Sequence, residues 1–276
     1  MTKIPFCKMS GSGNDFIIID NRSGAWNHLR EPAFVRSVCM RKMSVGADGC
    51  IFIEQSKACD FSWRFFNSDG SEAEMCGNGG RCAARFAALH GIAGSSLSFE
   101  TIAGVISADV CGSMVKIQLP EPQGLETGVT VNVEGRPLVL HSVNTGVPHA
   151  VVFVDNLESV PVAETGSRIR FHERFHPAGT NVNFVSHDTG NMLHIRTYER
   201  GVEGETFACG TGSVAAAVIS IALGKVSSPV QVTTRSGEAL SVHASGPGPP
   251  FKHVFLEGGA RFVCEGVIME EGFSFR

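Results

Sequence analysis

The chain repeats itself at a constant offset, and this repeat restricts the fold more than any other feature of its 276 residues. Cys76 and Cys209 stand 133 positions apart, each followed by Gly-x-Gly and an alanine-rich apolar run. Matches spread over more than 90 residues are hard to obtain by chance, so they indicate a duplicated domain. The further pairs at the same offset are Gly13/Gly146, Gly46/Gly179, Gly77/Gly210, Gly79/Gly212, Gly91/Gly224, Thr101/Thr234 and Gly104/Gly237.

The seam between the two copies is expected in the segment from Gln118 to Gly128, which has two prolines and no apolar periodicity. We therefore predict a first domain over residues 1–119 and a second over 120–261. The tail GGARFVCEGVIME has the composition of a strand, and we expect residues 262–276 to join the first domain.

Both halves place short strand-like runs before the repeated cysteine and further strands after it. The preceding runs are FIIID, CIFIEQ and FSWRFF in one half, and HAVVFVD, NVNFVS and MLHIRTY in the other. Helices are predicted from Gly79 to His90 and from Gly212 to Leu223, and both are apolar nearly all round, which is typical of buried helices. The pattern predicts an α+β fold: two pseudo-symmetric α/β rolls, each a mainly antiparallel sheet wrapped around a central helix.

Charge and hydropathy exclude several classes of partner. The net charge of −4 is mixed, without the basic block that nucleic-acid binding would need. The N-terminus lacks the apolar region of a secretory signal, and the longest apolar run, from Val214, is too short to span a bilayer. We expect a cytoplasmic protein with neither nucleic-acid nor membrane partners.

Nine cysteines are scattered along the chain. The number is odd and no C-x-x-C pair occurs, so neither a disulfide framework nor a structural zinc site is expected, and no metal is predicted. Most of these cysteines are expected to be small buried hydrophobic residues.

Cys76 and Cys209 differ from the others because each stands just before a predicted helix. The free N–H groups and the dipole of a helix start lower a thiol pKa and bind carboxylates. Two such sites facing one carbon would let one thiolate remove a proton next to a carboxylate while the other thiol returns a proton to the opposite face. The N–H groups would stabilise the enolate-like charge that develops.

Other interpretations remain open at this point. A hydrolase or acyl transferase with one catalytic cysteine and His149 as its base is conceivable, but it leaves the second cysteine without a role. A purely structural or binding module would need no titrating thiol. CGNGGR and CGTGS match neither the dinucleotide-binding fingerprint nor the phosphate-binding loop.

Several longer strings make the chain resemble the diaminopimelate epimerase family, whose wider superfamily includes proline racemase. The resemblance implies an isomerase that interconverts LL- and meso-diaminopimelate for lysine and peptidoglycan-precursor synthesis, with the site in a cleft between two domains. It implies that no cofactor is used and that the substrate is a small molecule, an amino acid, and it leaves a homodimer open as the assembly. The strings are KMSGSGNDF (from Lys8), VGADG (from Val45), FNSDGSEAEMCGNGGRC (from Phe66), GVPHAVVF (from Gly146), GTNVNF (from Gly179) and YERGVEGETFACGTGS (from Tyr198).

The same resemblance implies roles for individual residues. Cys76 and Cys209 correspond to the catalytic pair, and His149 to a histidine that tunes or orients the thiols. Glu199 and Arg200 correspond to a Glu-Arg pair that can bind an ammonium and a carboxylate. The other residues implied to bind substrate are Asn14, Asn67, Gly77, Asn78, Asn181, Gly210 and Thr211.

Two positions depart from the family pattern. Val147 stands where many relatives have a substrate-contacting asparagine, and the segment ERGVEGET is one residue longer than usual. Both concern recognition of the distal end of the substrate, so the alternative function is a cofactor-independent racemase of another amino acid, of the glutamate or proline type.

Overall fold

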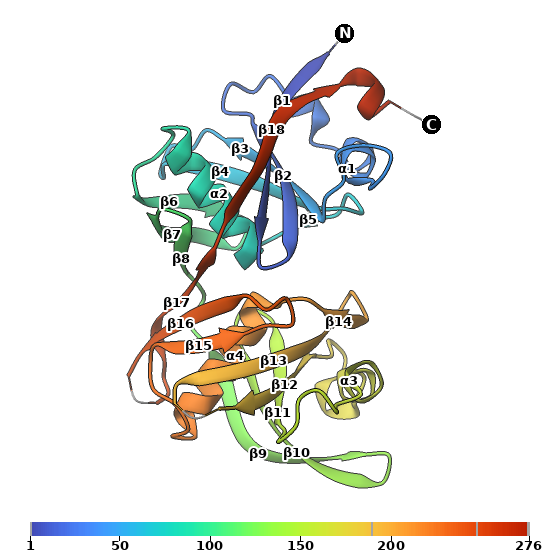
Figure 1. Ribbon diagram of the computed structural model, residues 1–276, viewed down its shortest axis with the longest axis vertical. Coiled ribbons are helices and arrows are strands. Elements are labelled where there is room, and N and C mark those ends of the chain that lie inside the picture. Colours follow the sequence, from blue (N-terminus) through green and yellow to red (C-terminus); the bar gives the residue numbers. More distant parts are fainter. Residues whose placement is uncertain (1, 189, 247, 275–276) are drawn as a thin grey trace. The chain divides into compact units, whose positions relative to one another are not determined.

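Two units make up the computed structural model, which describes residues 2–188, 190–246 and 248–274 (Figure 1). Unit 1 consists of Met1–Ile117 together with Gly258–Arg276, and unit 2 of Gln118–Glu257. The strands of unit 1 are β1 (Lys3–Gly11), β2 (Asn14–Asp20), β3 (Gly49–Glu54), β4 (Phe61–Asn67), β5 (Glu72–Ala73), β6 (Ser96–Thr101), β7 (Gly104–Cys111), β8 (Met114–Gln118) and β18 (Arg261–Met269).

The sheet of unit 1 has the order β18–β1–β2–β3–β4–β6–β7–β8, and the short β5 pairs with β4. Among the described strand pairs of this sheet, β2–β3 and β4–β6 alone are parallel. Figure 1 shows β18, from the end of the chain, running beside β1 from its beginning. The helices of this unit are η1 (Asn27–Leu29), α1 (Pro32–Cys39), α2 (Gly77–Leu89) and η3 (Glu270–Gly272).

Unit 2 repeats this arrangement with different strands. Its elements are β9 (Gln123–Val133), β10 (Arg136–Asn144), β11 (Pro148–Phe153), α3 (Val162–Arg170), η2 (Glu173–Phe175), β12 (Asn181–His187), β13 (Met192–Glu199), β14 (Gly204–Thr206), α4 (Gly210–Ala222), β15 (Val230–Thr233), β16 (Ala239–Ser245) and β17 (Lys252–Gly259).

The sheet of unit 2 has the order β9–β10–β11–β12–β13–β15–β16–β17, with β14 paired to β13. Its parallel pairs, β11–β12 and β13–β15, occupy the same places as those of unit 1. The predicted α+β class with duplicated, mainly antiparallel rolls is confirmed. β18 pairs with β1 as β9 pairs with β10, so the strand that begins unit 2 in sequence has its counterpart at the C-terminal end of unit 1. The last two residues of the predicted segment 262–276 lie outside the described residues.

The repeated glycines serve turns that other residues would strain. Both members of the pairs Gly13/Gly146 and Gly46/Gly179 have positive φ, between 67° and 107°, where a side chain is disfavoured. At Gly179 a Cβ would in addition collide with the guanidinium of Arg170. Repetition of the glycines therefore reflects repetition of the turns.

The two central helices begin at Gly77 and Gly210, two residues before the predicted starts, because Cys76 and Cys209 are their N-caps. From Gly212 to Ile221 every residue of α4 is buried, and α2 is buried over most of its length. Each helix packs against the strands of its own unit. The sequence therefore located the helices that carry the candidate thiols.

A second helix, which the sequence pattern did not predict, covers the opposite face of each sheet. Along β2 and β3, Ile17 and Phe52 pack with α1, while the alternate residues Phe16 and Ile51 face the start of α2. In unit 2, α3 packs in the same way against β12 and β13. Burial on both faces explains why FIIID and CIFIE are continuously apolar rather than alternating.

Among the residues that the structure describes, no helix combines the length and the apolar character that crossing a bilayer requires.

Candidate active site

Each repeated cysteine caps the N-terminus of a buried helix. Cys76 (φ −144°, ψ 116°) and Cys209 (φ −127°, ψ 112°) have extended backbones, as N-cap residues do. The Sγ atom of Cys76 accepts a hydrogen bond from the N–H of Gly79 at 3.4 Å, and that of Cys209 from the N–H of Gly212 at 3.4 Å. Each sulfur therefore lies at the positive end of a helix dipole, where a thiolate is favoured.

In unit 1, side chains from two elements meet at the start of α2. Asn78 donates from Nδ2 to Oδ1 of Asn14 at 2.6 Å, and Asn14 donates to Oδ2 of Asp48 at 3.2 Å. Asp15 receives hydrogen bonds from Arg41 and Lys8, which hold its pKa below the ordinary value although burial acts to raise it. These contacts fix the turn that carries Asn14 against the helix start.

Arg81 lies directly beneath this helix start with a fully buried side chain. Its Nη2 atom donates to Oδ1 of Asn78 at 3.0 Å and to Oγ of Ser12 at 2.6 Å, and its Nε donates to the carbonyl of Gly259 at 3.4 Å. A buried guanidinium one turn into the helix adds a full positive charge to the partial charge of the helix end. The site thus favours an anion.

Asn67, the last residue of β4, is exposed and is not part of this cluster. Its Nδ2 donates to Oγ of Ser71 at 3.1 Å, within the turn that follows the strand. Its amide is accessible to a ligand.

In unit 2, a chain of hydrogen bonds leads from the sheet to the sulfur of Cys209. Asn183 donates from Nδ2 to Nδ1 of His149 at 3.0 Å, Nε2 of His149 lies 3.0 Å from Oγ1 of Thr211, and this hydroxyl lies 3.5 Å from Sγ of Cys209. Thr145 binds the carbonyl of Thr211 at 3.0 Å and holds the first turn of α4 in place.

The chemistry of the partners fixes the direction of this chain. Asn183 also donates to the carbonyl of Ala150 and accepts from the hydroxyl of Thr197, which identifies its donating nitrogen. Nδ1 of His149 is therefore the acceptor, Nε2 carries the proton and donates to Thr211, and the hydroxyl proton of Thr211 is available to Cys209. The relay delivers a hydrogen bond to the sulfur.

His149 is fixed in its neutral form. Its side chain is buried, and burial lowers its pKa to about 3, with the charge of Arg200 acting in the same direction. A ring that is neutral at every working pH and has its Nδ1 lone pair occupied cannot take a proton from a nucleophile in the manner of a hydrolase base.

The Glu-Arg pair lies at the end of β13. Asn181 is buried, and its Oδ1 accepts from the backbone N–H of Arg200 at 2.8 Å. The guanidinium of Arg200 donates to the carbonyl of Ala178 at 3.1 Å. Burial raises the pKa of Glu199. The longer segment after Arg200 closes as a turn in which Glu203 binds the N–H of Gly201 and the side chain of Arg170.

The structure thus brings the predicted residues together in two groups. In unit 1, Cys76, Gly77, Asn78 and Asn14 lie at the start of α2. In unit 2, Cys209, Gly210, Thr211 and His149 lie at the start of α4, and Asn181, Glu199 and Arg200 lie at the ends of β12 and β13. Sequence reasoning missed Arg81 and Asn183, although both stand inside quoted strings, CGNGGRC and GTNVNF. Each is a polar residue among neighbours that are expected to be buried. This was the signal in the sequence that could have identified both residues.

The fold of two rolled units is shared with known structures. A phenazine biosynthesis protein of the PhzF family from Bacillus anthracis superposes with a TM-score of 0.75 at 18% identity, covering 98% of this chain and 100% of the other. A probable proline racemase from Agrobacterium radiobacter, with bound carbonate, gives 0.71 at 15% identity, covering 98% and 94%. These similarities define the fold class.

The family follows from the sequence comparisons. A model described as diaminopimelate epimerase matches residues 6–122 and 141–263. The chain is 50% identical to a diaminopimelate epimerase from Aquifex aeolicus, over 98% of this chain and 99% of that one. It is 44% identical to one from Archaeoglobus fulgidus, over 96% of both. The chain belongs to the diaminopimelate epimerase family and is an isomerase.

Proposed function

We propose that the chain interconverts LL- and meso-diaminopimelate by proton transfer at one α-carbon between the thiols of Cys76 and Cys209, in lysine and peptidoglycan-precursor synthesis. The observation that carries the proposal is the matched pair of helix caps: two sulfurs in the same backbone setting, each bound by a helix N–H at 3.4 Å. A reaction that must serve two mirror-related faces of a carbon needs such a pair.

In the proposed mechanism, one thiolate removes the α-proton while the opposite thiol donates a proton to the other face. The substrate carboxylate would bind the N–H groups at Gly77–Asn78 and Gly210–Thr211, and these groups stabilise the charge that develops on it. Arg81 adds positive charge at the first of these helix starts. The hydroxyl of Thr211 stabilises Cys209 as a thiolate by donating to its sulfur.

The second head of the substrate would serve for recognition. Arg200 can bind a distal carboxylate and Glu199 a distal ammonium, and Asn14, Asn67 and Asn181 offer both donors and acceptors. No cofactor enters this scheme, because thiols supply both the base and the acid.

The hydrolase alternative has less support. It requires His149 to accept a proton, whereas its Nδ1 is occupied by Asn183 and its pKa is lowered to about 3. Racemisation of another amino acid uses the same thiols, and only the choice of substrate separates it from the proposal.

Solvent exchange tests the proposal. The purified chain is incubated in D₂O with diaminopimelate, glutamate or proline, and deuterium is located by NMR. We expect deuterium at one α-carbon of diaminopimelate and none in glutamate or proline.

Substitution of the two thiols is the second test. Cys76→Ala and Cys209→Ala should each lower epimerisation at least about a hundredfold. Cys111→Ala, which changes an exposed cysteine outside the site, is the control and should keep its activity. If either Cys76→Ala or Cys209→Ala epimerised at the wild-type rate, the two-thiol mechanism would be wrong.

A further inference from the structure

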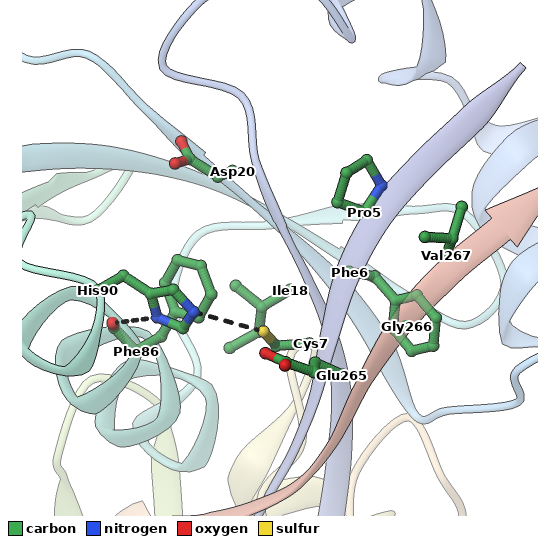
Figure 2. A pocket seen from close by; sticks show the side chains of 10 residues that line it. All are labelled: Pro5, Phe6, Cys7, Ile18, Asp20, Phe86, His90, Glu265, Gly266 and Val267. Atoms are coloured by element: carbon green, nitrogen blue, oxygen red, sulfur yellow. Dashed lines mark hydrogen bonds between the residues drawn. The ribbon is translucent and has the colours of Figure 1, made fainter.

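A cluster of three potential metal ligands lies in unit 1, away from the start of α2. Cys7 on β1 faces Glu265 on β18 as its partner in the antiparallel ladder, so both side chains are on the same face of the sheet. His90 follows the last residue of α2 and reaches the same place. Figure 2 shows the sulfur of Cys7, the ring of His90 and the carboxylate of Glu265 turned toward one another. Their ligand atoms all lie within 4.8 Å of one another.

The imidazole of His90 is held in the orientation that a metal ligand needs. Its Nδ1 lies 2.9 Å from the carbonyl of Phe86, and since a carbonyl only accepts, Nδ1 carries the ring proton. Nε2 then presents its lone pair toward Cys7. The ring is stacked on Phe86, with centroids 4.1 Å apart, and near Phe262, at 6.4 Å. A hydrogen bond from the non-ligating nitrogen to a carbonyl is the usual support of a metal-binding histidine.

The spacing of the donors fits zinc. With Zn–S near 2.3 Å, Zn–N near 2.05 Å and a tetrahedral angle, a thiolate and an imidazole nitrogen on one ion are about 3.6 Å apart. Sγ of Cys7 and Nε2 of His90 are 3.7 Å apart. Glu265 supplies an oxygen ligand. The cluster borders a cavity of about 350 Å³, also lined by Ile18 and Asp20 (Figure 2), which leaves room for a water molecule as the fourth ligand.

A catalytic reading of the same three residues has less support. A nucleophilic cysteine needs a lowered pKa. Burial raises the pKa of the Cys7 thiol to about 11, and the charge of Glu265 adds to this, so the thiol by itself is inert. A divalent cation supplies the positive charge that would favour the thiolate.

We propose that Cys7, His90 and Glu265 form a binding site for Zn²⁺ or a similar thiophilic divalent ion, with an exchangeable fourth position. Sequence spacing gave no indication of the site, because its ligands come from the two ends of the chain and from the end of a helix between them. The ion would join β1, β18 and the C-terminal end of α2, and so stabilise unit 1. It has no part in the proposed proton transfer.

Cobalt titration tests the site. The reduced full-length chain, freed of metals by a chelator, is titrated with Co²⁺ and followed by the thiolate-to-cobalt charge-transfer absorption. We expect one equivalent to bind in the wild type and Zn²⁺ to displace it. Cys7→Ser should lose the absorption. His90→Gln and Glu265→Gln should each bind at least about tenfold more weakly, since even the loss of a group that supports a ligand costs that much.

Two controls separate this site from the candidate active site. Cys264→Ser changes the neighbouring exposed cysteine of β18 and should titrate like the wild type. The double variant Cys76→Ala/Cys209→Ala should keep the absorption, which distinguishes this site from binding at the catalytic thiols. At the same concentration, Zn²⁺ should raise the Tm of the wild type more than that of His90→Gln. The proposal is overturned if the wild type shows no thiolate–cobalt absorption or if Cys7→Ser retains it. It is also overturned if Glu265→Gln, which changes an exposed side chain, binds Co²⁺ like the wild type.

Discussion

A Cβ on Gly212 would stand inside the contact distance of Oδ1 of Asn183, so the helix that carries Cys209 packs directly on the amide that orients His149. The equivalent glycine of unit 1, Gly79, meets only hydrophobic side chains, of which Cδ1 of Ile51 is the nearest at 3.3 Å. The two halves of the repeat are therefore similar in backbone but different in the contacts behind the thiols.

This difference predicts unequal effects of the same substitution. Gly212→Ala should displace Asn183 and leave buried hydrogen-bonding groups unpaired, at about 1–3 kcal/mol each. Gly79→Ala requires only a small shift of the Ile51 side chain. We expect Gly212→Ala to lose most epimerase activity and to lower the Tm by roughly 2–4 °C per kcal/mol, well beyond the change in Gly79→Ala. Thermal melts and rates for the pair provide the comparison, and equal losses would show that the contact with Asn183 has no special importance.

The relay to Cys209 predicts a separation between two substitutions of one residue. Thr211→Val keeps the shape and the backbone N–H but removes the hydroxyl, whereas Thr211→Ser keeps the hydroxyl. We expect Thr211→Val to lower kcat about 10- to 100-fold, the equivalent of one lost charge-assisted hydrogen bond, and Thr211→Ser to remain near the wild type. The pH at which the rate rises should also move upward in Thr211→Val, since the thiolate loses a donor. Similar rates for both variants would exclude the hydroxyl from the mechanism.

The neutral state of His149 predicts a pH dependence of stability. Its pKa is about 3 in the folded chain and about 6.5 in the unfolded chain, so between these values only the unfolded chain binds the proton. The contribution of the neutral ring to the free energy of unfolding is complete above pH 6.5. It is lost progressively as the pH falls toward 3. Between pH 7 and pH 5 the loss should be on the order of 2 kcal/mol. Urea unfolding at these two pH values should show a smaller decrease for His149→Gln than for the wild type. Parallel decreases would mean that this ring is not buried as a neutral group.

Local sequence patterns encode the duplicated fold and its central helices, but not the second helix of each unit. The duplicated fold was predictable because a constant offset and glycine-dependent turns are properties of the chain itself. Strong apolar patterning identified α2 and α4. The second helices, α1 and α3, were missed because they are short. Their apolar pattern is hard to distinguish from that of the strands around them. Their starts were visible in part, as the proline at position 32 stands where helices tolerate it.

The candidate site was predictable in its thiols but not in its supporting shell. Cys76 and Cys209 are marked by repetition, whereas Asn183 acquires its role only when β12 pairs with β11 and brings it beside His149. Cys7 and Glu265 likewise meet only through the pairing of β1 with β18. Contacts between residues distant in sequence depend on the register of the sheet, which no local pattern specifies.

The buried guanidinium of Arg81 gives the last prediction. It joins the start of α2, through Asn78, to the turn at Ser12 and to the carbonyl of Gly259. Arg81→Lys keeps the charge, but an ammonium cannot bind these three separated acceptors in the fixed geometry of a guanidinium. The orientation of Asn78 should loosen, and the proposed carboxylate site with it.

We therefore expect Arg81→Lys to raise the KM for diaminopimelate about tenfold, the equivalent of one hydrogen bond, while kcat changes less. Arg81→Met, which leaves the acceptors unpaired and removes the charge, should lose both stability and activity. Arg85→Lys is the matched control, because Arg85 lies one turn further along α2 and binds the carbonyls of Gly112 and Ala260 instead. Steady-state kinetics and thermal melts of the three variants compare their KM, kcat and Tm. A KM for Arg81→Lys no higher than that for Arg85→Lys would assign Arg81 to the folding of unit 1 alone, with no part in holding the substrate carboxylate.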